Sequence, residues 1–473
     1  MAIDISVGDS FVTAIDSSGK LLAWGSNSYG QLGQINFNPA GRSTPSQIGN
    51  VSSSWKSVAC SSQNYYFIDA NFALWACGLG TTGSLGDNTS ASKSSPVQVG
   101  TSSWASVSAG YTHVAAIDSV GRLFTWGPNA SGQLGDGTTV NKSSPVQVGT
   151  SSWSKVASGS THTVAIDSVG RLFTWGTNAG GQLGDGTTIN KSSPVQIGTS
   201  SWSMVSAASS QTMAIDSVGR LFAWGLNTNG RLGDGTAVSK SSPVQIGTSS
   251  WVTVSGSSNS AAIDKNGRLF TWGTGANGGL GDGTTINKSS PVLIGTSSWT
   301  MVECGTSYTL AIDSAGRLFS WGLNSSGQLG DGYTIAKSSP VQVGTSSWTM
   351  VTVWHADSTS AWTSGGIDIG GKLYAWGTNT SGCQGDGTTI GKSSPVLIGT
   401  IATFTSSYNF VSSGYNHILA SDISNNLWVW GDSSYGQAGN VNPLGTKMSF
   451  GVLVGNYKYI NNLLSGGNFN IKQ

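Results

Sequence analysis

Histidine side chains are the first candidates for catalysis or metal binding, because imidazole is a common general base and metal ligand. The chain has four histidines, and His113, His162 and His417 occupy one equivalent position of a repeated sequence. Other copies of the repeat fill this position with Phe11, Asn64, Gln211, Asn259, Tyr308 and Thr363. A position filled so variously cannot form a repeated catalytic device. We therefore expect a hydrogen-bonded structural role for these histidines.

Acidic side chains are the second source of possible chemistry. Glu303 is the only glutamate, so paired carboxylates for hydrolysis would have to come from aspartates, and no pair outside the repeat stands out. The loop acids recur in L/Q-G-D-G or L-G-D-N phrases, at Asp87, Asp136, Asp185, Asp234, Asp282, Asp331 and Asp386. An Asp-Gly pair favours a turn, whereas Ca²⁺ takes about 6–8 oxygen ligands. We predict turns and no metal site, with calcium binding by these loops as the alternative.

Other catalytic signatures are missing from the sequence. The cysteines Cys60, Cys77, Cys304 and Cys383 are far apart and match no zinc or redox spacing. There is neither a P-loop nor a G-x-S-x-G nucleophile phrase. We therefore predict a protein that is not an enzyme, with no catalytic residues and no cofactor.

The elements that carry these residues belong to a repeat of about 49 residues, clearest from Gly121 to Trp153 and from Gly170 to Trp202. Its aligned positions are Trp24, Cys77, Trp126, Trp175, Trp224, Trp272, Trp321, Trp376 and Trp430. An unbroken repeat argues for one structure built by stacking rather than for several domains. We expect a single domain over residues 1–473.

Each repeat predicts a four-stranded antiparallel meander, which in the third copy covers Trp104 to Val107, Val114 to Ile117, Arg122 to Trp126 and Pro145 to Val148. Asp118 and its counterparts then form the turn between the second and third strands. The second strand is apolar on both faces, so its sheet needs cover on both sides. Stacked blades of a β-propeller supply that cover, and a solenoid is the alternative.

The segments Val107 to Ile117, Val156 to Ile166 and Val411 to Ser421, each followed by a W-G phrase, resemble the regulator of chromosome condensation repeat. This resemblance implies an all-β propeller, and the best-known family members have seven blades. We predict a single ring of about nine four-stranded antiparallel blades. A seven-bladed ring with extra units and an open spiral are the alternatives. Residues 457–473 look like a partial terminal repeat that closes the ring.

Composition limits the partners. Charged residues make up 9% of the chain and the net charge is +1, which offers no electrostatic footprint for nucleic acid or an anionic membrane. No signal peptide is recognisable, and no apolar run reaches the roughly 20 residues that span a bilayer. Near-identical units rich in Ser, Thr, Gly and Asn suggest a virion or cell-surface location.

The eighth repeat departs from the others through an insertion between Val351 and Asp368. It adds Trp354, His355, Asp357 and Trp362, which have no counterparts elsewhere. Tryptophan offers a large contact area at low entropic cost, so these four residues are our predicted partner-binding site for a protein or a surface glycan. The alternative is that the insertion only covers a blade edge.

Together these observations predict a non-enzymatic interaction or structural module that presents a loop face to a protein or glycan. A bacteriophage virion component or a surface adhesin is the specific form that we favour from composition. The alternative, implied by the family resemblance, is a regulatory factor that promotes guanine-nucleotide exchange on a small GTPase or acts on another intracellular protein. The chain lacks the basic tail that accompanies this activity in the family.

Overall fold

The computed structural model describes residues 3–7, 11–15, 20–33, 42–48, 54–353 and 363–398, except positions 62, 112, 209, 257–258, 306, 381 and 383. It also describes the strand segments 408–413, 417–422, 426–433, 446–456, 460–462 and 469–472.

The third repeat forms a four-stranded antiparallel sheet in the order β9-β10-β11-β12. Its strands are β9 (Trp104–Ala109), β10 (Val114–Asp118), β11 (Leu123–Gly127) and β12 (Lys142–Gln147). The predicted meander is therefore confirmed. The fourth strand begins at Lys142 rather than at the predicted Pro145, because proline is tolerated on an outer edge strand, where its missing N–H costs no ladder bond.

Within the described residues, nine successive units of this kind follow one another along the chain. Blades 1 and 2 contain β1 (Ile3–Val7), β2 (Phe11–Ile15), β3 (Leu21–Gly25), β4 (Arg42–Gln47), β5 (Trp55–Cys60), β6 (Asn64–Asp69), β7 (Leu74–Gly78) and β8 (Lys93–Gln98). Blade 3 is β9–β12, and blades 4 and 5 contain β13 (Trp153–Ser158), β14 (His162–Asp167), β15 (Leu172–Gly176), β16 (Lys191–Gln196), β17 (Trp202–Ala207), β18 (Gln211–Asp216), β19 (Leu221–Gly225) and β20 (Lys240–Gln245).

The second half of the chain continues the pattern. Blade 6 contains β21 (Trp251–Gly256), β22 (Asn259–Asp264), β23 (Leu269–Gly273) and β24 (Lys288–Leu293). Blades 7 and 8 contain β25 (Trp299–Cys304), β26 (Tyr308–Asp313), β27 (Arg317–Gly322), β28 (Lys337–Val353), β29 (Thr363–Asp368), β30 (Leu373–Gly377) and β31 (Lys392–Leu397). Blade 9 contains β32 (Tyr408–Ser413), β33 (His417–Asp422), β34 (Asn426–Ser433) and β35 (Thr446–Asn456). The long β28 pairs with β27 and with β29, so it joins blades 7 and 8 into one sheet.

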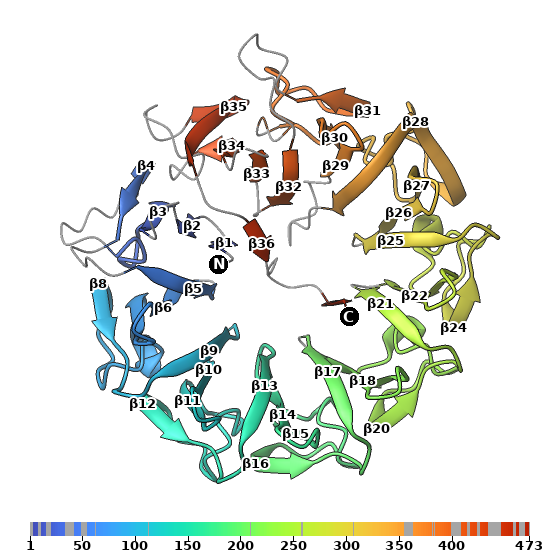
Figure 1. Cartoon of the computed structure of the whole chain (residues 1–473). Coiled ribbons are helices and arrows are strands. Elements are labelled where there is room, and N and C mark those ends of the chain that lie inside the picture. The colour runs from blue at the N-terminus through green and yellow to red at the C-terminus, as the bar shows by residue number, and fades with distance from the viewer. Residues whose placement is uncertain are drawn as a thin grey trace.

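The blades stand around a central opening (Figure 1), with the first strand of each blade toward the centre and the fourth toward the outside. This all-β arrangement of repeated four-stranded antiparallel sheets confirms the predicted β-propeller class. Short 3-10 helices occur in the long loops at η1 (Thr81–Gly83), η2 (Thr228–Gly230) and η3 (Ala276–Gly278). Across the described part of the chain, no helix is long and apolar enough to cross a membrane.

Two further strands lie near the centre of the ring (Figure 1), namely β36 (Ile460–Asn462) and β37 (Phe469–Lys472). Strand β36 pairs in parallel with β1, and β37 pairs in antiparallel fashion with β21. The closing role that we predicted for residues 457–473 stays a prediction.

The hydrophobic core lies between blades rather than within one. One cluster combines Ile117, Leu123 and Val148 of blade 3 with Trp153 and Trp175 of blade 4. The Trp153 ring packs edge-on against Trp175, with ring centroids 6.1 Å apart. Aromatic pairs of this geometry add about 0.5–1.5 kcal/mol beyond the area that they bury. Each sheet thus receives cover on both faces from its neighbours.

Candidate functional site

The acidic residue of the turn between the second and third strands is committed to that turn. In blade 3, Asp118 Oδ1 accepts the backbone N–H of Val120 and of Arg122, and Oδ2 lies 2.6 Å from Arg122 Nε. The Arg122 guanidinium lies 5.6 Å from the centre of the Phe124 ring. The same ion pair recurs at Asp167, Asp216, Asp264 and Asp313. The predicted turn role of these aspartates is confirmed.

The histidine position joins one blade to the next. His113 Nε2 lies 2.7 Å from Thr163 Oγ1, and this hydroxyl donates to the carbonyl oxygen of Gln133 at 2.8 Å. Because the Thr163 hydroxyl donates its proton to the Gln133 carbonyl, its oxygen can only accept from His113. His113 must therefore donate through Nε2–H. His162 stands in the same relation to Thr212, with its Nε2 3.2 Å from the hydroxyl oxygen.

Both histidines are neutral at physiological pH. Burial, together with the nearby His162, lowers the pKa of His113 to about 3. Burial also lowers the pKa of His162 to about 4. The predicted structural role is therefore confirmed for these two residues. The His417 side chain lies outside the described residues.

A buried asparagine, which the sequence reasoning missed, organises the long loop between the third and fourth strands. Asn129 Nδ2 donates to Asp136 Oδ1 at 3.1 Å and to the carbonyl oxygens of Thr138 and Val140 at 3.0 and 3.2 Å. Its Oδ1 accepts the N–H of Leu134 at 2.9 Å. The sequence signal for it is the asparagine that recurs two positions after W-G.

The loop acid Asp136 is also fully engaged. It accepts the Thr138 hydroxyl at 2.8 Å and lies 3.2 Å from Lys142 Nζ. Burial acts to raise its pKa, but the hydrogen bonds from Thr138 and the lysine outweigh this effect and hold the pKa below its usual value. Among the residues that the structure describes, no three His, Cys, Asp or Glu side chains are grouped to hold a metal ion. Asp136 Oδ1 also accepts the backbone N–H of Thr138 at 3.0 Å, and this bond closes the predicted turn.

Each long loop is wedged against the following blade. The indole N–H of Trp175 donates to the carbonyl oxygen of Gln133 in the preceding loop at 2.9 Å. Gly135 has a φ of +73°, and a Cβ placed on it would lie 2.6 Å from Trp175 Nε1. The close approach excludes any side chain there. A loop held by such contacts is rigid, so the surface that it presents is preorganised.

The long-loop face exposes apolar side chains from this rigid frame. The equivalent residues Val140, Ile189, Val238, Ile286, Ile335 and Ile390 are 62–68% exposed. Blade 7 differs from the others because Tyr333 replaces the threonine that follows Asp-Gly, and it is 61% exposed. The Lys337 ammonium lies 5.0 Å from the Tyr333 ring centre. We name Tyr333, Ile335 and Lys337 the loop-7 patch.

The tyrosine changes the chemistry beneath the loop-7 patch. Without a threonine hydroxyl at this position, Asp331 Oδ1 accepts the backbone N–H of Tyr333 and the amide N–H of Asn324 but no hydroxyl. Its buried Oδ2 has no hydrogen-bond partner among the described residues and lies 3.6 Å from Lys337 Nζ. The other blades hold this ion pair at 3.0–3.3 Å. Blade 7 has thus lost internal bonds where it gained an exposed aromatic ring.

The loop of blade 7 also meets the strand that follows the insertion of blade 8. Ser364 Oγ donates to the carbonyl oxygen of Gln328 at 2.8 Å, and Trp376 Nε1 donates to the same oxygen at 2.9 Å. The Tyr308 hydroxyl donates to the Thr363 carbonyl at 3.1 Å. Strand β29, which follows the insertion, therefore adjoins the loop that carries the loop-7 patch.

Comparison with protein families identifies the repeat. The family described as RCC1-like domain matches residues 1–255. The regulator of chromosome condensation (RCC1) repeat matches residues 266–312 and 315–353, and a second family of that description matches 300–328 and 410–437. The chain belongs to the RCC1-like domain family. No curated protein matches it.

Several solved structures are similar to this RCC1-like chain. Human WBSCR16 is 21% identical and has a TM-score of 0.49, with 70% of this chain and 96% of that chain covered. Yeast RCC1 (Prp20), solved with Kap60 bound, is 19% identical with a TM-score of 0.48, covering 70% and 83%. Prp20p from Saccharomyces cerevisiae, whose binding to Gsp1p and histones has been studied, is 18% identical with a TM-score of 0.47, covering 70% and 88%.

The predicted partner-binding residues of this RCC1-like chain, Trp354, His355, Asp357 and Trp362, lie outside the described residues. The flanking strands β28 and β29 place the insertion between the first and second strands of blade 8. That connection emerges at the same end of the blades as the long loops, because both join strands in the same direction.

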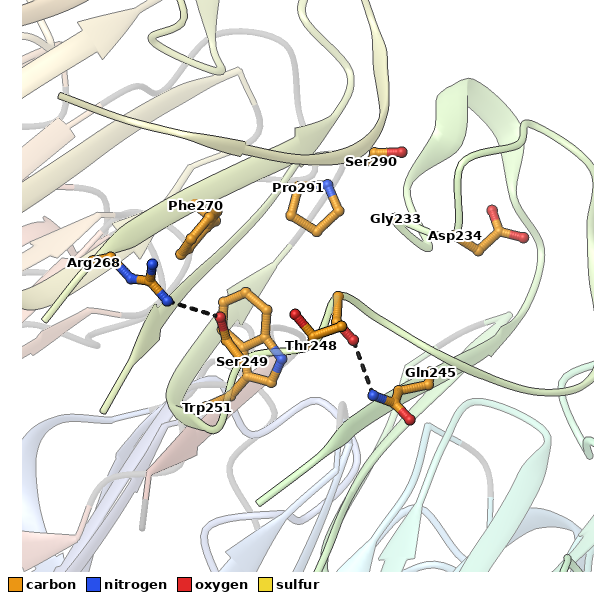
Figure 2. Close-up of a pocket in the computed structure, with 11 residues that line it drawn as sticks. Gly233, Asp234, Gln245, Thr248, Ser249, Trp251, Arg268, Phe270, Ser290 and Pro291 are labelled. Atoms are coloured by element: carbon orange, nitrogen blue, oxygen red, sulfur yellow. Dashed lines mark hydrogen bonds between the residues drawn. The ribbon is translucent and has the colours of Figure 1, made fainter. Parts of the chain in front are cut away.

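A cavity of about 490 Å³ lies between blades 5 and 6 (Figure 2). Its charged side chains and Gln245 are engaged by neighbouring residues. Asp234 lies 3.0 Å from Lys240, Arg268 lies 2.6 Å from Asp264, and Gln245 donates to the Gly247 carbonyl at 3.0 Å. Its lining residues recur at other blade junctions of the RCC1-like repeat. We interpret this cavity as a gap between stacked blades.

Proposed function

We propose that this RCC1-like propeller is a non-enzymatic module that binds a protein partner through its long-loop face, at blades 7 and 8. The observation that carries the proposal is the loop-7 patch, where an exposed tyrosine and isoleucine stand on a loop fixed to the next blade. Protein interfaces concentrate their binding energy in rigid aromatic anchors. The insertion with Trp354 and Trp362 extends the same surface in this proposal.

The described polar groups support binding rather than catalysis. The repeated aspartates form turns or ion pairs with Arg or Lys, and His113 and His162 are buried neutral links between blades. The long-loop face can therefore contact a partner through its shape and its exposed apolar area.

Site-specific photo-crosslinking tests the proposal. A benzophenone amino acid at position 333 should capture the partner from the native cell extract, whereas the same group at position 120 should not. Val120 is 68% exposed and lies in a turn at the opposite end of the blade, so it is a matched control for exposure. Equal capture from both positions, or capture from neither, would contradict the proposal. The captured partner should then bind the Tyr333→Ser variant at least tenfold more weakly than the parent.

Family membership favours a second candidate, namely guanine-nucleotide exchange on a small GTPase. Purified protein added to a small GTPase loaded with fluorescent GDP should then accelerate nucleotide release. Unchanged release from a panel of GTPases of the same cell would remove this candidate. The virion or adhesin form of the proposal, including a surface glycan as ligand, rests on composition alone. Particle fractionation and a glycan array test it.

A further inference from the structure

The first strand of each blade presents an edge to the central opening. Within the described residues, β9, β13 and β17 pair only with the second strand of their own blade. Their inner edges therefore carry no paired strand, although Ser108 of β9 and Ser158 of β13 are hydrogen-bonded to each other. Sheet edges without a paired strand are templates for another extended chain. Strand β21 of blade 6 differs, because β37 pairs with its inner edge.

The pairing with β37 coincides with unusually deep burial of β21. Thr253, Val254 and Ser255 are 8%, 0% and 2% exposed. The equivalent residues of β9 and β13 are partly or fully exposed. The inner edge of β21 is therefore covered where its counterparts are open.

The sequence of β21 suits the addition of a strand. Val252, Thr253 and Val254 form a run of β-branched residues, which favour extended backbone. Its last residue is Gly256, where the neighbouring blades have Ala207 and Cys304. The register sets Phe469 opposite Gly256 and Ile471 opposite Val254, so the largest residue of β37 is aligned with the smallest of β21.

We propose that the inner edge of β21 is a binding site for an extended peptide segment of a protein partner, and that residues 469–472 occupy it as an internal competitor. The partner segment adds as an antiparallel strand, with an aromatic residue opposite Gly256 and an aliphatic residue opposite Val254. Main-chain hydrogen bonds supply the affinity, and the glycine selects the register. Because the competing strand belongs to the same chain, its effective concentration is high and the site is closed to weak ligands.

A fluorescent peptide with the sequence of residues 465–473 tests the proposal in solution. The full chain carrying Asn470→Pro and Ile471→Pro should bind this peptide at least tenfold more tightly than the parent, because proline removes the donors of β37 and opens the edge. Equal affinity of the two proteins would overturn the proposal. Equal thermal unfolding midpoints would show that the ring stays folded.

Two methylated peptides test the mode of binding. In an antiparallel pair, alternate residues direct their N–H groups to the partner strand. One peptide is N-methylated at Phe469 and Ile471, and the other at Asn470 and Lys472. One of the two peptides should lose binding and the other should keep it. Loss with both peptides, or with neither, would exclude strand addition.

Matched variants locate the peptide site. Gly256→Val in the proline-carrying chain should weaken peptide binding at least tenfold, whereas Ala109→Val at the equivalent position of β9 should not. Equal effects would exclude β21 as the site. Tyr333→Ser should leave peptide affinity unchanged, because the loop-7 patch is a separate surface. The peptide site on β21 can therefore be disproved while the proposed loop-face function holds, and the loop-face function can be disproved while the peptide site holds.

Discussion

The indole N–H of Trp175 is bonded to the carbonyl oxygen of Gln133 at 2.9 Å, although the two residues belong to adjacent blades. The bond is repeated between Trp224 and Gln182 and between Trp376 and Gln328. The long loops of blades 2 to 7 are thus each bonded to the tryptophan of the next blade.

Gly135→Ala should destabilise the protein by about 3 kcal/mol or more, because the new Cβ would lie 2.6 Å from Trp175 Nε1 at a φ that disfavours L side chains. Gly149→Ala is the control. Gly149 has a φ of +60° with nothing within 4 Å of the added Cβ, so only the backbone cost of about 1–2 kcal/mol applies. Denaturant titration compares the two variants. Similar losses would show that the contact with the tryptophan does not matter.

Acidification should weaken the ring before the carboxylates titrate. The pKa of His113 falls on folding from 6.5 to about 3, so the unfolded state takes up a proton that the folded state refuses. The stability that the neutral His113 contributes is therefore fully present above pH 6.5. It is lost by about 1.4 kcal/mol per pH unit as the pH falls toward the pKa of the folded state, about 3.

His113→Asn tests this pH dependence, because asparagine occupies the same position in Asn64 and Asn259. Between pH 7 and pH 4.5, the variant should lose about 2.5 kcal/mol less stability than the parent. Unfolding free energies measured across this range decide the matter. If the unfolding free energies of the two proteins changed equally with pH, the assignment of this pH dependence to His113 would be contradicted.

Asn129→Ala should cost about 3 kcal/mol, since it removes a buried amide that bonds Asp136, Leu134 and two carbonyl groups. Gln147→Ala removes an exposed side chain with a single bond to the Gly149 carbonyl, and it should change stability by less than about 0.5 kcal/mol. Hydrogen exchange should also show faster opening of residues 134–140 in the first variant alone. Unchanged exchange there would mean that the amide does not hold the loop.

Replacing Trp354 and Trp362 by Ala should weaken binding of the partner captured at position 333 and leave the unfolding midpoint unchanged. If the insertion and the loop-7 patch form one surface, the combined effect with Tyr333→Ser should depart from additivity by about 0.5 kcal/mol or more. Calorimetric titration of the single and combined variants measures this coupling. If the losses of binding free energy were strictly additive, the insertion and the loop-7 patch would make separate contacts with the partner.

The sequence predicted the contents of one repeat better than the contacts between repeats. The strands of blade 3, the Asp118 turn and the buried role of His113 all follow from local pattern and variation. The partner of Gly135 is a tryptophan of the next copy, which no reading of one repeat reveals. The pairing of Thr253 with Lys472 joins segments that are far apart in the sequence. The residue pattern of either segment does not indicate the other as its partner.

The candidate site was predictable only in part. Tyr333 breaks the Thr-Thr-Ile phrase as visibly as the insertion of blade 8 breaks the spacing, so the sequence held the signal. Its exposure could not be inferred, because the equivalent Thr138 of blade 3 is partly buried and bonded to Asp136. Burial at this position depends on how the whole loop folds.

The contact between Trp175 and the loop of the preceding blade has an evolutionary consequence. Because blades 3, 4 and 5 offer nearly the same surface to both neighbours, a duplicated copy inserted among them would find every partner already in place. Unequal recombination between such similar gene segments could therefore lengthen or shorten the array by whole units without compensating mutations. The unit number of this protein then records its duplication history as much as any demand of folding.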